Sequence, residues 1–216
     1  VAAAVQAARM NKSVVLLEFG THLGGLTSGG LGATDIGNKA AIGGVAREFY
    51  QRVGKYYGTN EIWTFEPHVA KETLVEMLRE KNVPVQFQQR LASVKKKGNR
   101  ITEIRMENGD VFRAKIFIDA TYEGDLMAKA KVSYTVGREA NSKYQETLNG
   151  IRENTPQHQF TVPVDPYVQS GKSKSGLLPF IQSGSGGKPG DGDRCVQAYN
   201  FRLCLTQNPT NRLPIL

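Results

Sequence analysis

The residue best placed to do chemistry is Glu18, which directly follows the apolar run 14–17. An acid at the end of a strand can accept hydrogen bonds from the ribose hydroxyls of a dinucleotide, and its charge repels a phosphorylated ribose. The Ala-rich segment 1–10 is typical of the helix that precedes such a strand, whereas the first strand of the unit and its GxGxxG turn are missing before Val1. Glu18 therefore indicates a cofactor site. The alternative is an acid that only marks where a buried strand meets solvent.

A glycine-rich stretch follows Glu18, with five glycines among the nine residues 24–32. Glycine permits positive φ angles and lets another molecule approach the backbone closely. Backbone N–H groups left free in such a stretch can hold an anion or polarise the edge of a ring. The GxxxxGK[ST] pattern is absent, so a P-loop is not indicated. A flexible loop is the alternative, but the position just beyond a ribose-type acid favours a binding site.

Three carboxylates, Asp119, Glu123 and Asp125, follow the apolar run 116–118. Small residues at the carboxyl end of a strand fit the place where open α/β sheets bind ligands. Paired carboxylates also suit acid–base chemistry or a hard metal ion. No partner cluster of metal ligands is visible in the sequence, so we expect no metal site.

The elements that must position these residues alternate between helix and strand. Two amphipathic helices are predicted near 45–56 and 67–78, the second with proline in its first turn. Asn108-Gly109 is a strong hairpin signal between two strands. This order predicts an α/β fold with a small inserted β-meander, and its strands are expected at 14–17, 83–87, 91–94, 101–106 and 111–118. One more strand is expected at 196–206, as the start of a second domain.

Composition limits the classes of protein that the chain can represent. It has 216 residues, two cysteines and a net charge of +8. Cys195 and Cys204 have neither metal-type nor Cys-x-x-Cys spacing, and two cysteines cannot make a disulfide scaffold. No apolar run approaches the roughly 20 residues that cross a bilayer. The basic run 95–97 is expected at the solvated tip of a hairpin, so we expect neither a nucleic-acid nor a membrane partner.

The segments 14–18, 24–30 and 118–125 together resemble FAD-dependent oxidoreductases with the glutathione-reductase-type flavin fold. Segments 134–140 and 197–206 are similar to a bacterial subgroup of that family, some members of which carry the name xanthan lyase. The likeness extends over most of the chain, and the order of the motifs makes it specific. It implies a Rossmann-like FAD-binding domain with an inserted antiparallel β-meander, followed by the start of a β-rich substrate domain.

The resemblance also implies domain boundaries and a truncation at both ends. Residues 1–140 form a partial FAD-binding domain without its first strand and GxGxxG turn. Residues 141–216 form a partial substrate or cap domain, with a mobile Gly-rich loop or lid at 183–193. The family's C-terminal segment, which completes the flavin site, is also missing, so we expect this piece alone to bind FAD weakly and to be inactive. Tyr122 stands where the family has glycine and limits how closely the backbone there can approach the cofactor.

Roles for individual residues follow from the same resemblance. Glu18 is implied to hold the adenosine ribose, whereas Asp125 is a weaker contact that can also cap the next helix. The adenine contacts are Leu91 and Ala92, and the contacts near the phosphates are Ala120 and Thr121. Those along the pyrophosphate and the isoalloxazine edge are Gly24, Gly25, Leu26, Thr27 and Ser28.

Catalytic residues are harder to name, because the chemistry of a flavoenzyme belongs to its cofactor. His22 lies beside the glycine stretch and is a weak candidate, with a surface histidine as the alternative. Arg138, Tyr199 and Arg202 are weak candidates for a polar substrate wall, and Tyr199 is equally compatible with core packing.

The expected function is electron transfer between FAD and a small organic substrate, which the resemblance narrows to a carbohydrate-related one. The alternatives are a polysaccharide lyase and a noncatalytic basic binding module. Oligomeric state stays open, and localisation stays open between the cytoplasm and the periplasm or exterior, because the true N-terminus is expected to be missing.

Overall fold

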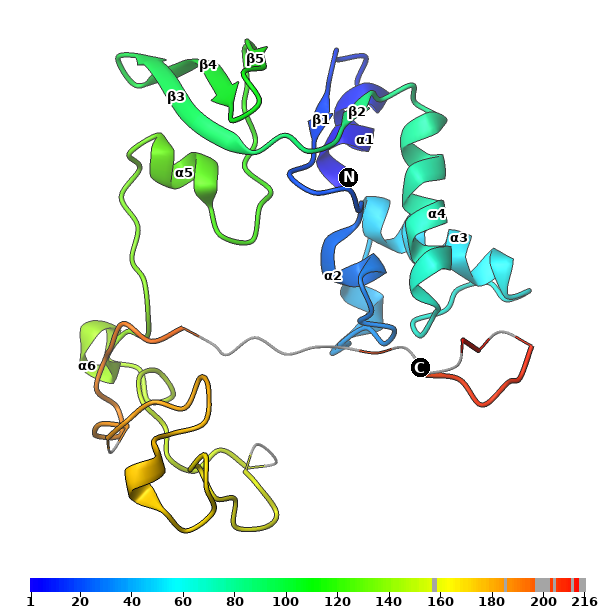
Figure 1. The fold of residues 1–216 in the computed structure, drawn as a ribbon. Helices are drawn as coiled ribbons and strands as arrows, with labels where there is room; N and C mark the ends of the chain where they lie inside the picture. The colour runs from blue at the N-terminus through cyan, green and yellow to red at the C-terminus, as the bar shows by residue number, and fades with distance from the viewer. Residues whose placement is uncertain (157–158, 185, 197–202, 204, 211, 214–216) are drawn as a thin grey trace. The chain divides into compact units, whose positions relative to one another are not determined.

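The computed structural model describes residues 1–156, 159–184, 186–196, 203, 205–210 and 212–213. The chain forms two compact units, one made of residues 1–132 with 200–216 and the other of residues 133–199. Figure 1 follows the chain from its blue N-terminus to its red C-terminus. Helices and strands are both present, in agreement with the predicted α/β class. None of the helices in the described part of the chain is both long and apolar enough to span a lipid bilayer.

The core of the first unit lies where three helices meet a small parallel sheet (Figure 1). The helices are α1 (Ala2–Arg9), α3 (Gly44–Tyr56) and α4 (Pro67–Arg79). The sheet pairs β1 (Leu16–Leu17) with β2 (Val85–Gln86). Each large apolar side chain buried here contributes about 1.5–3 kcal/mol. The buried cluster consists of Ala4, Val5, Leu23, Phe49, Val53, Phe65, Val69, Ala70, Met77, Leu78 and Val83.

The helices form where the apolar periodicity predicted them. In α3 the buried residues Phe49 and Val53 are one turn apart and share a face. In α4 Pro67 occupies the first helical turn, where a missing N–H costs no hydrogen bond. Two shorter helical segments, α2 (Gly25–Ser28) and η1 (Lys39–Ala41), lie between β1 and α3.

The parallel strands are shorter and less buried than the sequence predicted. Leu16 pairs with Val85 and Leu17 with Gln86, so β1 covers only the second half of the predicted strand 14–17. Both of its residues are half-buried and Val15 is 39% exposed. A continuous apolar run such as 14–17 predicts a strand buried on both faces. This prediction is wrong for the described residues, because Leu16 and Leu17 are each only half-buried.

The predicted meander is an antiparallel sheet of β3 (Leu91–Lys97), β4 (Arg100–Met106) and β5 (Val111–Phe112), in that order. The basic run 95–97 belongs to β3 rather than to the turn, which is formed by Gly98 and Asn99. Its side chains are exposed as expected, although Lys96 Nζ donates to the Ala130 carbonyl at 2.8 Å. This bond ties β3 to the end of α5 (Asp125–Lys129).

The predicted strand 111–118 ends after Phe112 in the structure. Residues 113–118 have no strand partner among the described residues, and Ile116 and Ile118 are 75% and 63% exposed. An extended apolar segment becomes a strand only when a neighbour accepts its backbone hydrogen bonds. The segment 113–118 has a composition typical of a strand, but it has no strand partner among the described residues, so the predicted strand is shorter in the structure.

The second unit holds few regular elements in the residues that the structure describes. They are α6 (Asn141–Tyr144), η2 (Ser173–Ser175) and an isolated bridge between Tyr167 and Leu177. The predicted strand 196–206 lies mostly outside the described residues. At the end of the loop 183–193, Gly190 N–H donates to Ile151 O and Ile151 N–H donates to Asp191 O. The loop thus supplies backbone partners to the segment 138–151, and its mobility stays a prediction.

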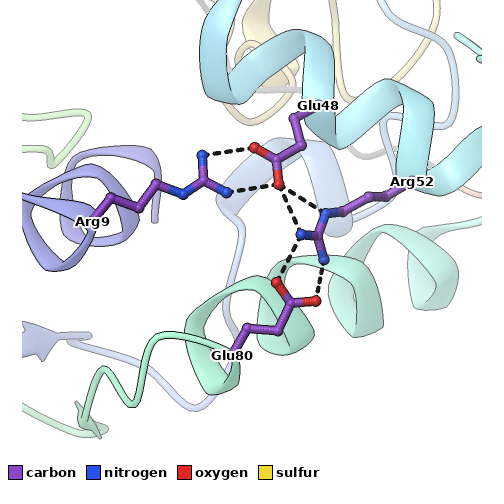
Figure 2. A network of polar contacts seen from close by, with 4 residues as sticks. All are labelled: Arg9, Glu48, Arg52 and Glu80. Carbon is purple, nitrogen blue, oxygen red and sulfur yellow. Dashed lines mark hydrogen bonds and ion pairs between the residues drawn. The ribbon is translucent and has the colours of Figure 1, made fainter.

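The three helices of the first unit are also joined by four alternating charges (Figure 2). Glu48 on α3 accepts two hydrogen bonds from Arg9 on α1 and two from Arg52, one turn further along α3. Arg52 also binds both oxygens of Glu80, at 2.6 and 2.7 Å, just beyond α4. The Arg9 bonds, followed by those of Arg52, lower the pKa of Glu48 although partial burial opposes this shift.

We expect Arg52→Ala to lower the free energy of unfolding by about 1–2 kcal/mol at pH 7, because it removes charged hydrogen bonds on a partly exposed surface. The pKa of Glu48 is depressed in the folded chain, so this stabilisation is present above the unfolded value of about 4.3 and is lost as the pH falls through the folded value. Urea unfolding at pH 7 and pH 3 measures both effects. Lys55→Ala, an exposed control on the same helix, should change stability by less than about 0.5 kcal/mol. An equal loss at the two pH values contradicts the prediction.

The connection from α3 to α4 depends on a buried glycine near the end of α3. A Cβ built on Gly54 lies only 2.5 Å from Glu61 Cα, so the returning chain packs directly on the helix backbone.

The same connection is also held by Tyr57, which follows the last residue of α3. The Tyr57 hydroxyl donates to Glu66 Oε2 and accepts the Glu66 N–H. Burial raises the pKa of Tyr57 to about 12, so the phenol keeps its proton for this bond at neutral pH.

Gly54→Ala is therefore expected to destabilise the chain by about 1–3 kcal/mol through overpacking. Helix propensity alone favours alanine by about 1 kcal/mol, so the sign of the effect distinguishes the two causes. Thermal or urea unfolding gives the measurement. Gly37→Ala serves as the control, because a Cβ there meets nothing within 4 Å. If Gly54→Ala instead stabilises the chain, the backbone at Glu61 moves to accommodate the added methyl group at little cost, and the prediction is wrong.

Candidate functional site

Glu18 lies at the carboxyl end of β1, beside the start of α1. Its Oε1 accepts the N–H of Gly20 at 2.8 Å, which holds the carboxylate over the turn after the strand. The charge of Glu18 acts on the backbone nitrogen of Val1, so the carboxylate lies near the beginning of α1. An acid between a strand end and a helix start is the arrangement expected for binding a ribose.

The chain that leaves β2 runs beside Glu18 and leads to the predicted adenine contacts. The N–H of Gln89 donates to the Glu18 carbonyl at 2.9 Å, and that of Gln88 donates to the Gly20 carbonyl at 2.9 Å. Gln89 is buried, and its side-chain amide donates to Asp110 Oδ2 in the turn between β4 and β5. Leu91 and Ala92 begin β3 of the antiparallel sheet two residues later, so they follow directly on the segment that is bonded to Glu18.

The glycine stretch forms one helical turn anchored in the core. Gly24 and Gly25 have φ angles of 106° and 55°, which only glycine adopts easily. A Cβ on Gly24 would lie 2.2 Å from Ser28 Oγ and 2.7 Å from Leu74 of α4. Ser28 itself is 2% exposed, and its hydroxyl donates to the Leu23 carbonyl. The turn is therefore a built feature rather than a loose loop.

His22 is hydrogen-bonded to Ser28, the last residue of this turn. Its Nε2 lies 3.0 Å from the Ser28 carbonyl oxygen and 2.9 Å from Ser28 Oγ. A carbonyl can only accept, and the Ser28 hydroxyl hydrogen is used on Leu23, so Nε2 carries the proton. The other ring nitrogen, Nδ1, is then the one left for acid–base work. The Ser28 hydroxyl thus donates to Leu23 and accepts from His22.

The turn 119–125 is organised by Asp119. Its Oδ1 accepts the N–H and the hydroxyl of Thr121, at 3.0 and 2.7 Å, and its Oδ2 accepts the N–H of Met127 at 2.9 Å. Burial raises the pKa of Asp119, but these hydrogen bonds outweigh it and lower the pKa overall. Asp125 is the first residue of α5, and Gly124 takes the N-cap position without a side-chain bond. The capping role expected of Asp125 is therefore filled by Asp119, whose oxygen reaches the third N–H of the helix.

Tyr122 joins the two predicted cofactor segments across 96 positions of sequence. Its hydroxyl oxygen accepts the Leu26 N–H at 2.7 Å. The turn 119–125 therefore lies within the reach of one tyrosine side chain from the turn 24–28, and the cofactor contacts of Ala120 and Thr121 stay a prediction. The sequence singled out Tyr122 only as a bulky residue and did not reveal this bond, because no local pattern links positions 26 and 122.

Of the catalytic candidates other than His22, the structure describes only Arg138. Arg138 belongs to the second unit, where its guanidinium pairs with Asp193 through Nε and Nη2. This pairing lowers the pKa of Asp193. Tyr199 and Arg202 lie outside the described residues. Cys195 is a free thiol whose Sγ lies 3.5 Å from Gln182 Oε1. Across the described residues, no group of three or more His, Cys, Asp or Glu side chains is arranged to hold a metal ion.

We expect Asp119→Asn to loosen the turn 119–127, because an amide NH2 replaces one of the two acceptor oxygens. Amide exchange of Met127 should become about 10-fold faster at pH 7, as measured by hydrogen exchange. The depressed pKa means that the contribution of Asp119 is present above the unfolded value of about 3.9 and is lost as the pH falls through the folded value. Asp35→Asn, at an exposed position, should leave Met127 exchange unchanged. Unchanged exchange in Asp119→Asn contradicts the assigned role.

Comparison with known proteins gives one match over the full length. The sequence matches the family model described as FAD dependent oxidoreductase over residues 1–216. Among curated proteins, none matches the chain.

Two solved structures are similar over about half of the chain. Bacillithiol disulfide reductase Bdr (YpdA) from Bacillus cereus has 20% identity and a TM-score of 0.34, with 51% of this chain and 32% of that chain covered. The tetracycline destructase Tet(51) has 22% identity and a TM-score of 0.31, with 52% and 32% covered. The match thus spans about a third of each of these proteins. Because the family model extends over every residue, this chain belongs to the FAD dependent oxidoreductase family.

Proposed function

We propose that the chain is the part of a larger flavoenzyme that holds the adenosine and pyrophosphate of FAD. The observation that carries the proposal is the position of Glu18, at the carboxyl end of a parallel strand and beside the segment that leads into Leu91. A carboxylate offers four acceptor positions, and Gly20 uses one of them. Glu18 therefore keeps enough acceptors for two ribose hydroxyls, and the donor chemistry fits the adenosine end of FAD.

The glycine turn suits the next part of the cofactor. Gly24 and Gly25 present backbone without side chains, and Ser28 holds that backbone from below. A pyrophosphate or a ring edge can approach such a surface closely. Ala120 and Thr121 complete the site from the other side, on a turn fixed by Asp119.

FAD, when bound, supplies the electron transfer between the cofactor and a small organic substrate, for which we propose a carbohydrate-related compound. The chain's own residues bind and orient. Glu18 holds the ribose, the turn 24–28 lies along the pyrophosphate and the edge of the isoalloxazine ring, and His22 offers Nδ1 as a proton acceptor. We assign residues 1–140 to FAD binding and 141–216 to the substrate side.

Exposed apolar residues support the proposal that the functional enzyme is longer than this chain. Val15 flanks β1, and Ile116 and Ile118 lie in an extended segment without a strand partner among the described residues. Side chains of this kind are normally covered by a neighbouring strand. A strand of the longer protein, placed against them, supplies that cover.

The full-length protein is expected to purify yellow, and Glu18→Ala is expected to weaken FAD binding by about 10- to 100-fold, because hydrogen bonds to a charged group are lost. Flavin absorbance and fluorescence titration measure both. Glu72→Ala, an exposed acid on α4, is the matched control and should bind FAD normally. Residues 1–216 alone should bind FAD weakly. A colourless full-length protein that still turns over substrate rejects the proposal.

A further inference from the structure

The ring of Tyr122 lies directly over the bare backbone of Gly25. A Cβ built on Gly25 would be 2.3 Å from the Tyr122 hydroxyl oxygen and 3.1 Å from its Cζ. The ring can come this close only because residue 25 has no side chain. Its edge oxygen accepts the next N–H of the turn, that of Leu26. The surface of Gly25 and Leu26 thus fits a planar group that carries an acceptor at its edge.

Tyr122 is fixed at its base and weakly held at its ring. The backbone on either side is anchored, because Asp119 binds Thr121 and the Thr121 hydroxyl accepts the Gly124 N–H at 2.9 Å. Tyr122 itself is 74% exposed, and the bond to Leu26 secures its end. Rotation of the side chain outward therefore breaks one hydrogen bond and leaves the turn 119–125 intact.

The glycine turn does not depend on Tyr122 for its shape. Ser28, buried beneath it, is bonded to Leu23 and to His22. Leu23 is part of the core, with 3% of its surface exposed. When the Tyr122 ring leaves, the turn keeps its conformation and the Leu26 N–H becomes free to donate elsewhere.

We propose that Tyr122 is a gate on the flavin site. In the closed form seen here the phenol covers Gly25 and satisfies the Leu26 N–H. Binding of FAD displaces the phenol, because the isoalloxazine ring is also planar with acceptor atoms at its edge and needs the same surface. The gate lowers the affinity for the flavin ring and leaves the affinity for the adenosine part unchanged. This inference rests on the proposed function, since it concerns access to the same site.

The test compares Tyr122→Phe with the wild type in the full-length protein after removal of its FAD. Tyr56→Phe, which also alters an exposed tyrosine of the first unit, is the control. Hydrogen exchange of the Leu26 amide without cofactor reports whether the contact exists in solution. Titration with FAD and with ADP, which lacks the flavin ring, reports what the contact does.

Loss of one neutral hydrogen bond predicts Leu26 exchange that is about 2- to 10-fold faster in Tyr122→Phe, FAD binding that is tighter by a similar factor, and ADP binding that is unchanged. Equal or weaker FAD binding by Tyr122→Phe overturns the gate and leaves the proposed function standing. If neither protein binds FAD, the proposed function fails and the gate fails with it. Tighter ADP binding also overturns the gate, because the effect then does not concern the ring.

Discussion

The candidate site depends on the parallel pairing of β1 with β2. Parallel strands end at the same edge, so the chain leaves both strands on one side of the small sheet. Glu18 and the glycine turn follow the first strand, and Gln89 and the meander follow the second. Two residues per strand are a weak sheet by themselves, so the pairing relies on the helices α1, α3 and α4, whose apolar faces bury one side of it. Every residue that we assign to adenosine binding takes its position from this edge.

A second organising feature is the contact between segments that are distant in sequence. Asp119 turns a run of small residues into a fixed turn, and Tyr122 extends from that turn to the backbone at Leu26. Together with the buried Ser28 hydroxyl, these bonds give the turns 24–28 and 119–125 a defined shape. Small residues permit close approach to a ligand, but they cannot hold their own conformation, so hydrogen-bonding side chains next to them must do so.

Much of this fold could be predicted from the sequence, because the periodicity of α3, the proline of α4 and the Asn108-Gly109 turn are local signals. Glu18 at a strand end and the glycine turn were recognisable for the same reason. The ends of β1 and β5 were not, since strand length depends on a partner elsewhere in the chain. Two further features depend on tertiary geometry. Asp119, rather than the predicted Asp125, caps α5, and Tyr122 is bonded to Leu26. Local spacing carries no information about a contact across 96 residues.

The ion-pair network of the three helices affects the position of the sheet edge at which Glu18 lies. It consists of Arg9, Glu48, Arg52 and Glu80. The hydrophobic effect is non-directional, whereas charged hydrogen bonds have a preferred distance and angle, so they add a more specific constraint on how helices are offset along their axes. Displacing α3 by one residue, about 1.5 Å, stretches the bonds to both of its neighbours at once. The network therefore restricts how far α1, α3 and α4 can shift along their axes relative to one another. Since β2 begins five residues after Glu80, the network also restricts the position of β2 and, through the pairing of β2 with β1, the position of Glu18.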